Sequence, residues 1–356
     1  TKDGSIAAFD DAGTGKTFGQ DCVFLTGGMS YYSDSGMTWA LNLTDSCGST
    51  AVKLVSGKDS MNAAQDGGFK NIAVTDAADN TTAVSLTMGD ASAVNIGSST
   101  GGQNALYGLS VSGDAQTETT LFTNHIYGTN YGVWDSGTTV TLTGSDTNTY
   151  KTITGTNKDG AYVENGSLSL SNYSVFGEAN GVTVNQSAAS LTGISLDNDQ
   201  DAGDIGLQVG KSGVSTVTLD TATVLGNVGI QIDSGSSLTL KNGITVTGLT
   251  RGVSVLDGSV TNYASGVYSV GSANLVKGTG TNSFALFVQK GTVNLDSYTF
   301  DAAVTGGTGV ETADTDSATV KLSYDTVSGK DNAYVWGDQN GIIVGRNTIM
   351  TLSDYK

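Results

Sequence analysis

Metal-binding residue types are concentrated in one acidic stretch of the chain, Asp197-Asn-Asp-Gln-Asp-Ala-Gly-Asp204. Asp197, Asp199 and Asp201 place carboxylates at alternate positions, as at positions 1, 3 and 5 of a calcium-binding loop. The match is incomplete, because glycine stands at position 7 instead of 6 and Gln208 replaces the glutamate of position 12. The stretch is either a Ca²⁺ site or an acidic, solvated loop. No cofactor other than this Ca²⁺ is expected.

Groups for acid–base or nucleophilic catalysis are sparse. The chain has one histidine, His125, and Gly97-Ser-Ser-Thr-Gly101 matches the letters of a nucleophile elbow without the helix that an elbow requires. A polysaccharide lyase needs cationic groups beside the substrate carboxylate, and the arginines are only Arg251 and Arg346. A glycoside hydrolase needs two carboxylates across a cleft, which the many aspartates could supply. We expect a protein that is not an enzyme, with a β-helical lyase or glycoside hydrolase as the alternative.

A repeat in the sequence predicts the strands on which these candidate residues would lie. It has the form Gly-Φ-x-Φ-x-x-(Gly/Ser), in which Φ is aliphatic or alanine. Clean copies begin at Gly160, Gly181, Gly206, Gly229 and Gly252. Their period of about 23 residues is typical of solenoids. Runs that alternate apolar and polar residues lie between the copies, as short strands do. The sequence predicts an all-β fold, a right-handed single-stranded parallel β-helix with coils of about 23 residues.

The repeat, called the frame below, also predicts which side chains point outward. Its two Φ residues face the interior, and the residue between them faces solvent. Weaker copies, with Gly132, Ala285 and Asn332 in the first place, extend the series. We expect the outward residues to form a column that contacts a ligand or partner: Trp134, Tyr162, Thr183, Gln208, Gln231, Ser254, Phe287 and Tyr334. The alternative is an ordinary solvated strand face with a polar middle and aromatic ends.

Composition agrees with stacked strands and restricts the partners. The chain has 50 glycines and no proline; glycine would supply corners with positive φ, and proline would interrupt a strand ladder. The net charge of −18 disfavours nucleic acid, anionic lipid and highly sulfated glycans as partners. No apolar run is long enough for a membrane helix, so none is expected. The polar start at Thr1 shows no signal peptide, which we interpret as a mature or trimmed form.

Two regions are predicted along the chain. Residues 1–60 lack the frame and hold both cysteines, Cys22 and Cys47, so we expect an N-terminal cap or irregular first coils. A lone cysteine pair fits one disulfide, Cys22–Cys47, with two unrelated thiols as the alternative. Residues 61–356 are expected to form the β-helix. The longer step from Gly252 to Ala285 predicts an insertion of about ten residues in that coil.

Copies such as Gly181–Ser187, Gly229–Gly235 and Gly252–Gly258, with outward Ser, Thr and Asn and an acidic balance, resemble the passenger domains of AIDA-type autotransporters. The resemblance covers about residues 80–356, and the cysteine pair departs from many members. It implies a Gram-negative surface adhesin, displayed from the outer membrane through a C-terminal barrel that this chain lacks. It also implies attachment to a host extracellular-matrix protein or glycan, or cell–cell aggregation and biofilm formation through a second copy of the chain.

Overall fold

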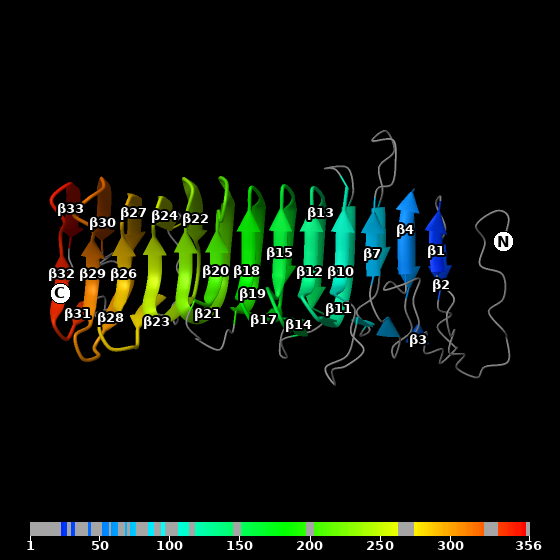
Figure 1. Ribbon diagram of the computed structural model, residues 1–356, viewed down its shortest axis with the longest axis horizontal. Coiled ribbons are helices and arrows are strands. Elements are labelled where there is room, and N and C mark those ends of the chain that lie inside the picture. The colour runs from blue at the N-terminus through cyan, green and yellow to red at the C-terminus, as the bar shows by residue number, and fades with distance from the viewer. Residues whose placement is uncertain are drawn as a thin grey trace. The chain divides into compact units, whose positions relative to one another are not determined.

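The protein is a β-solenoid of parallel strands, seen in a computed structural model as coils of about 25 residues (Figure 1). Upstream of residue 97 the structure describes strand backbones between residues 23 and 96. Downstream it describes residues 106–113, 118–144, 151–196, 203–262, 274–323 and 334–353. These residues form strands, turns and corners, and among them no helix is long and apolar enough to span a bilayer. The all-β solenoid prediction is therefore confirmed, while the right-handed sense of the coil stays a prediction.

The chain divides into two compact units, Thr1–Gly177 and Glu178–Lys356. In unit 1, three strands per coil pair in parallel with the matching strands of the next coil, which builds three sheets. Sheet A carries the frame: β1 (Val23–Thr26), β4 (Val52–Ser56), β7 (Ile72–Thr75), β10 (Tyr107–Ser112), β12 (Tyr131–Ser136) and β15 (Ala161–Glu164).

Sheets B and C of unit 1 follow sheet A in each coil, and the long strand β11 (Glu118–Gly128) takes part in both. The other strands of sheet B are β2 (Ser30–Tyr32), β5 (Lys58–Asn62), β8 (Ser85–Met88), β13 (Thr139–Gly144) and β16 (Ser167–Ser171). The other strands of sheet C are β3 (Asn42–Leu43), β6 (Gly68–Phe69), β9 (Val94–Ile96), β14 (Lys151–Gly155) and β17 (Tyr173–Gly177).

Unit 2 repeats the same three-sheet order. Three long strands turn corners between sheets: β19 (Ala188–Leu196) contributes to sheets B and C, β21 (Thr216–Ile232) to all three sheets, and β23 (Ile244–Val255) to sheets C and A. The remaining strands of sheet A are β18 (Asn180–Asn185), β20 (Ile205–Val209), β26 (Phe284–Val288), β29 (Thr308–Thr312) and β32 (Asn340–Ile343). Those of sheet B are β22 (Ser236–Leu240), β24 (Gly258–Asn262), β27 (Gly291–Asp296), β30 (Ala318–Ser323) and β33 (Thr348–Ser353). Those of sheet C are β25 (Asn274–Gly278), β28 (Tyr298–Ala302) and β31 (Val335–Gly337).

The number of residues between two paired residues on successive coils gives the length of each coil. Leu207 pairs with Ile230 and Ile230 with Val253, so these two coils are equal in length and have the predicted period. Val253 pairs with Leu286, which makes the next coil longer, and the predicted insertion between Gly252 and Ala285 is confirmed. The inward Leu207 and Ile230 have no exposed surface and Val253 only 1%. Burying each such side chain stabilises the fold by about 1.5–3 kcal/mol, and the columns of these residues form the core.

The frame glycines are required for close approach between coils. A Cβ on Gly206 would lie 2.7 Å from the carbonyl oxygen of Gly229, and one on Gly229 would lie 2.6 Å from that of Gly252. None of these three residues has a positive φ, so the first glycine of the frame serves close approach between coils and not a left-handed corner. Left-handed corners occur instead at the end of the frame, as at Gly137 (φ 80°) and Gly235 (φ 72°).

A second set of corners lies between sheets B and C, and each such corner that the structure describes in unit 2 takes one left-handed residue. Gly193 (φ 59°) and Gly243 (φ 58°) occupy it without strain, whereas Thr221 has φ 52° at the same corner. A β-branched residue in this region costs about 1–2 kcal/mol relative to its ordinary conformation. Gly193 and Gly243 agree with the expectation that glycine supplies corners of positive φ, whereas Thr221 departs from it.

The strand order in residues 23–62 is the same as further along the chain. β1 pairs with β4 and β2 with β5, in the parallel arrangement of the later coils. The predicted division into a cap (1–60) and a β-helix (61–356) stays a prediction. Cys22 and Cys47 lie outside the described residues, so their disulfide stays a prediction.

Candidate binding surface

The predicted outward residues stand in register on sheet A, in each unit separately. In unit 1, Trp134 pairs with Tyr162. In unit 2 the order is Thr183, Gln208, Gln231, Ser254 and Phe287. These positions are called the outward column below.

Tyr334 is not part of this column. Val335, the residue after it, pairs with Phe300 in sheet C, so the frame copy assigned to Asn332 is wrong. The number of residues from Ala285 to Asn332 equals two coils of the common period, but the strand that follows Asn332 does not belong to sheet A. The second of the two real coils, from Val310 to Ile342, is longer than the first, from Leu286 to Val310.

The true column continues from Phe287 to Glu311 and Ile343. These two residues were missed, although a sequence signal existed for the second. Gly341-Ile-Ile-Val344 fits the first four positions of the frame. For Glu311 the signal is weaker, because threonine takes the second Φ position in Gly309-Val-Glu-Thr312.

Burial corrects the expectation that the polar middle of the column faces solvent. Thr183 and Ser254 have no exposed surface, and Gln208 is 8% exposed. Neighbouring side chains cover them: Asn180 donates from Nδ2 to Thr183 Oγ1 (3.1 Å), and Arg251 donates to Ser254 Oγ (3.3 Å). A partner cannot reach these residues on the folded surface, whereas Gln231 is partly exposed.

The covering residues form a second column that sequence reasoning missed. Each stands immediately before the glycine position of the frame, three residues before an outward residue, and the columns therefore run side by side. We call this the flanking column. In unit 1 it contains Tyr107 and Tyr131. In unit 2 it contains Asn180, Ile205, Val228, Arg251, Phe284, Thr308 and Asn340.

Aromatic residues of both columns meet in unit 1. The rings of Tyr107 and Tyr131 are parallel within 3°, with centroids 5.8 Å apart. Tyr107 also contacts Trp134 at 5.5 Å, and Tyr131 contacts Tyr162 at 5.6 Å. All four side chains are partly exposed. Tyr107, Tyr131, Trp134 and Tyr162 are called the aromatic platform below.

One cation stands at the platform. Lys158 is exposed, and its Nζ lies 5.2 Å from the centroid of the Tyr131 ring. Such a contact is worth about 0.5–1 kcal/mol at an exposed site. The lysine adds a charged hydrogen-bond donor beside one ring of the platform.

The aromatic residues of unit 2 are arranged differently. Phe284 and Phe287 contact each other with centroids 5.8 Å apart, and the guanidinium of Arg251 lies 4.2 Å from the centroid of Phe287. Burial lowers the pKa of Arg251, while Glu311 raises it. Burial raises the pKa of Glu311, with Arg251 lowering it and Asp314 adding to the rise. The ring of Phe287 thus already has a partner within the protein.

His125 has a structural environment on sheet C. Its Nδ1 lies 2.6 Å from Thr152 Oγ1, and its ring stacks on Tyr127 with centroids 5.9 Å apart. Burial and the nearby charge of Lys151 lower the pKa of His125, which favours the neutral ring. These contacts fix the ring on the strand surface.

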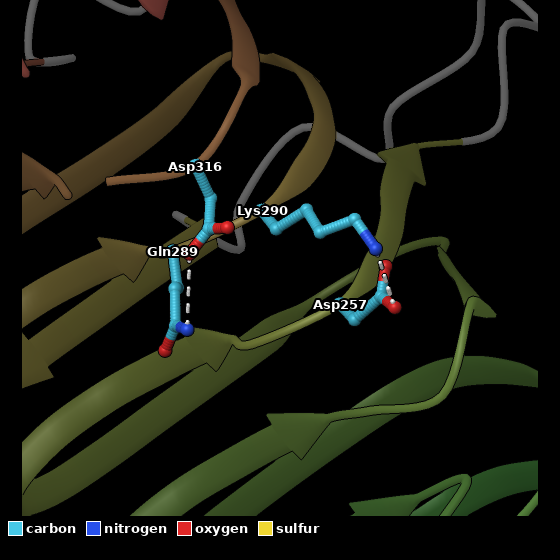
Figure 2. A network of polar contacts seen from close by, with 4 residues as sticks. All are labelled: Asp257, Gln289, Lys290 and Asp316. Carbon is cyan, nitrogen blue, oxygen red and sulfur yellow. Dashed lines mark hydrogen bonds and ion pairs between the residues drawn. The ribbon is translucent and has the colours of Figure 1, made fainter. Parts of the chain in front are cut away.

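Polar side chains at the corners after sheet A connect successive coils. Figure 2 shows Lys290 paired with Asp257 (3.0 Å) and Gln289 donating to Asp316 (3.2 Å). The side chains of Lys290 and Asp257 are 54% and 41% exposed. Exposed pairs of this kind contribute about 0–1 kcal/mol, so we interpret them as links between coils.

The predicted calcium ligands Asp197, Asp199 and Asp201 lie outside the described residues, and their role stays a prediction. Within the part of the chain that the structure describes, no group of three or more His, Cys, Asp or Glu side chains could hold a metal ion.

Comparison with known proteins gives no relative from which a site could be inferred: no family model, curated protein or solved structure matches this chain.

Proposed function

We propose that this chain is a bacterial cell-surface adhesin that binds a neutral glycan through the aromatic platform. The observation that supports this most is the meeting of four partly exposed rings, Tyr107, Tyr131, Trp134 and Tyr162, on one sheet. Exposed aromatic clusters are unusual on a soluble surface and mark interaction sites. The resemblance to autotransporter passengers adds the surface location and the adhesive role.

The chemistry of the platform suits a sugar. Tyrosine and tryptophan combine an apolar ring with a polar edge, which matches a pyranose that has a C–H face and a rim of hydroxyls. Lys158 supplies a further donor beside Tyr131. The net charge of −18 opposes strongly anionic glycans over long range, so a neutral glycan fits better than a sulfated one.

Self-association through the polar middle of the outward column loses its support, because Thr183, Gln208 and Ser254 are covered. Pairing of two copies would have to use other residues. Binding to a matrix protein through the same platform is a distinct outcome of the binding experiment.

The experiment measures binding of the whole chain to immobilised neutral oligosaccharides, such as β-1,4-linked glucose and N-acetylglucosamine oligomers. Tyr131→Ala and Trp134→Ala should each weaken binding about tenfold or more, because buried aromatic anchors dominate interfaces. Phe287→Ala serves as the control, since that ring is already covered by Arg251. Binding to matrix protein but not to any sugar, or equal loss in all three variants, would refute the proposal.

A β-helical lyase or glycoside hydrolase is the second candidate, and one observation favours it. Burial raises the pKa of the partly buried Glu311 carboxyl, Arg251 opposes the rise and Asp314 adds to it, and a carboxyl with a raised pKa can act as a general acid. Incubation with neutral and uronic-acid polysaccharides tests it. Release of oligosaccharides that disappears in Glu311→Gln would establish the enzyme and displace the adhesin.

A further inference from the structure

An acidic side chain occupies the interior of unit 1. Asp135 is the second Φ residue of the frame that begins at Gly132, and it stands in register between Val111 and Val163. Both neighbours are fully buried, and Asp135 itself has no exposed surface. A carboxyl thus takes the place that valine holds in the coils on either side.

The carboxyl has few hydrogen-bonding partners. Thr138 Oγ1, itself 1% exposed, donates to Oδ1 of Asp135, whereas Oδ2 has no hydrogen-bond partner among the described residues. A Cβ on Gly166 would lie 2.8 Å from Oδ2, so the glycine leaves room for the carboxyl. An ionised carboxylate in this place would be stabilised only by the hydroxyl and the backbone of Thr138, whereas water would offer several donors to both oxygens.

Charged groups do not face Asp135 from the described elements around it. The titratable residues of the adjoining strands β10 and β15 are Tyr107, Tyr162 and Glu164, and all three are partly exposed. The inward residues of the other two sheets in the same coil are aliphatic: Val140, Leu142 and Ile153. In the part of unit 1 that the structure describes, the interior therefore offers no positive charge to balance a carboxylate.

We propose that Asp135 is a pH-responsive element in the core of unit 1, protonated in the folded coil on the acid side of neutrality, and that its ionisation loosens the coil that carries Trp134. This goes beyond glycan binding and does not depend on it. Each solenoid coil contacts only its neighbours, so a charge in one coil acts locally. The residue before Asp135 is Trp134, which places the effect directly beneath the aromatic platform.

The direction of the pH effect follows from burial. Burial raises the pKa of Asp135 from 3.8 to about 7, with the Thr138 hydrogen bonds opposing the rise in part. The folded coil therefore binds the proton more tightly than the open coil. Its stabilisation is complete below pH 3.8 and is lost as the pH rises to about 7, beyond which the penalty is constant.

Hydrogen exchange of the whole chain at about pH 5 and pH 8, corrected for the intrinsic exchange rates, tests the proposal. For peptides within residues 131–144, linkage predicts an opening constant larger at the higher pH by on the order of 50- to 100-fold. Peptides within residues 229–240 should change little. A denaturant concentration at which both regions open measurably keeps the comparison quantitative.

Variants isolate the carboxyl. Asp135→Asn keeps the shape and Asp135→Val matches the neighbouring coils; in both, the pH dependence of peptides 131–144 should vanish. Glu164→Gln, a partly exposed carboxylate of the next coil, should leave it intact. The same protection at both pH values in the unaltered chain, or an unchanged pH dependence in Asp135→Asn, would overturn the proposal. Because no ligand is added, failure here is distinguishable from failure of the glycan proposal.

Discussion

The guanidinium of Arg251 lies over the ring of Phe287, 4.2 Å from its centroid, although the two residues belong to successive coils. Arg251 pairs in register with Phe284, so the contact with Phe287 is diagonal, from the flanking column to the outward column. The same arginine donates to the buried Ser254. This relationship shows how flanking residues decide which outward residues remain accessible.

Removing the arginine should therefore destabilise unit 2. Arg251→Ala loses the cation–π contact and leaves Ser254 Oγ without this donor, a cost of about 1–2 kcal/mol in the free energy of unfolding. Denaturant unfolding measures it, with the exposed Arg346→Ala as the control. Equal stabilities of the two variants would show that the contact contributes nothing.

Because residues of the outward column differ in burial, the same substitution should cost different amounts of unfolding free energy at two of its positions. Thr183→Asp places a charge where no surface is exposed, and we expect a loss of about 3 kcal/mol or more in unfolding free energy. Gln231→Asp introduces the same charge at a partly exposed position, where it replaces the hydrogen bond that Gln231 donates to Asp233 by a like charge; it should cost about 1–2 kcal/mol, less than Thr183→Asp. Urea midpoints of the two variants test this, and a tolerated Thr183→Asp would contradict the burial.

Replacing a frame glycine by alanine should destabilise the fold wherever the next coil lies against that glycine. In Gly229→Ala the new Cβ would meet the Gly252 carbonyl at 2.6 Å, and we expect a cost of about 2–4 kcal/mol. Gly341→Ala is the matched control, since the nearest atom to its Cβ would be 3.8 Å away. Thermal unfolding should separate the two variants; similar destabilisation by both would mean that close approach is not the reason for glycine.

The corner at Thr221 offers a stabilising substitution. Asparagine tolerates left-handed φ better than threonine, so Thr221→Asn should raise the unfolding free energy by about 0.5–1 kcal/mol. Thr223→Asn, an exposed position two residues along the same strand, should instead be neutral or destabilising. A loss of stability in Thr221→Asn would show that the threonine side chain contributes more than its strain costs.

The inward columns could be predicted because the frame spacing determines them: Leu207, Ile230 and Val253 are buried in register, as the pattern required. The flanking column could not be predicted from the frame. Its residues contact outward residues three positions further along the same strand, and this contact depends on the frame glycine that lies between the two. Tyr334 was assigned to the wrong sheet because the longer last coil moves the frame further along the chain than an even period predicts. Asp135 is visible in the sequence, but its environment depends on Thr138 and on the absence of facing charges among the described residues.

The central claim, that the aromatic platform is the binding surface, is tested most directly by the indole N–H signals of the tryptophans in a nuclear magnetic resonance titration with a neutral oligosaccharide. The chain has three tryptophans, and Trp134→Phe assigns the relevant signal. Trp336 is 57% exposed and lies outside the platform, so it is an internal control. We predict that the Trp134 signal shifts with saturation while the Trp336 signal stays in place. A shift of Trp336 without a shift of Trp134 would contradict the account.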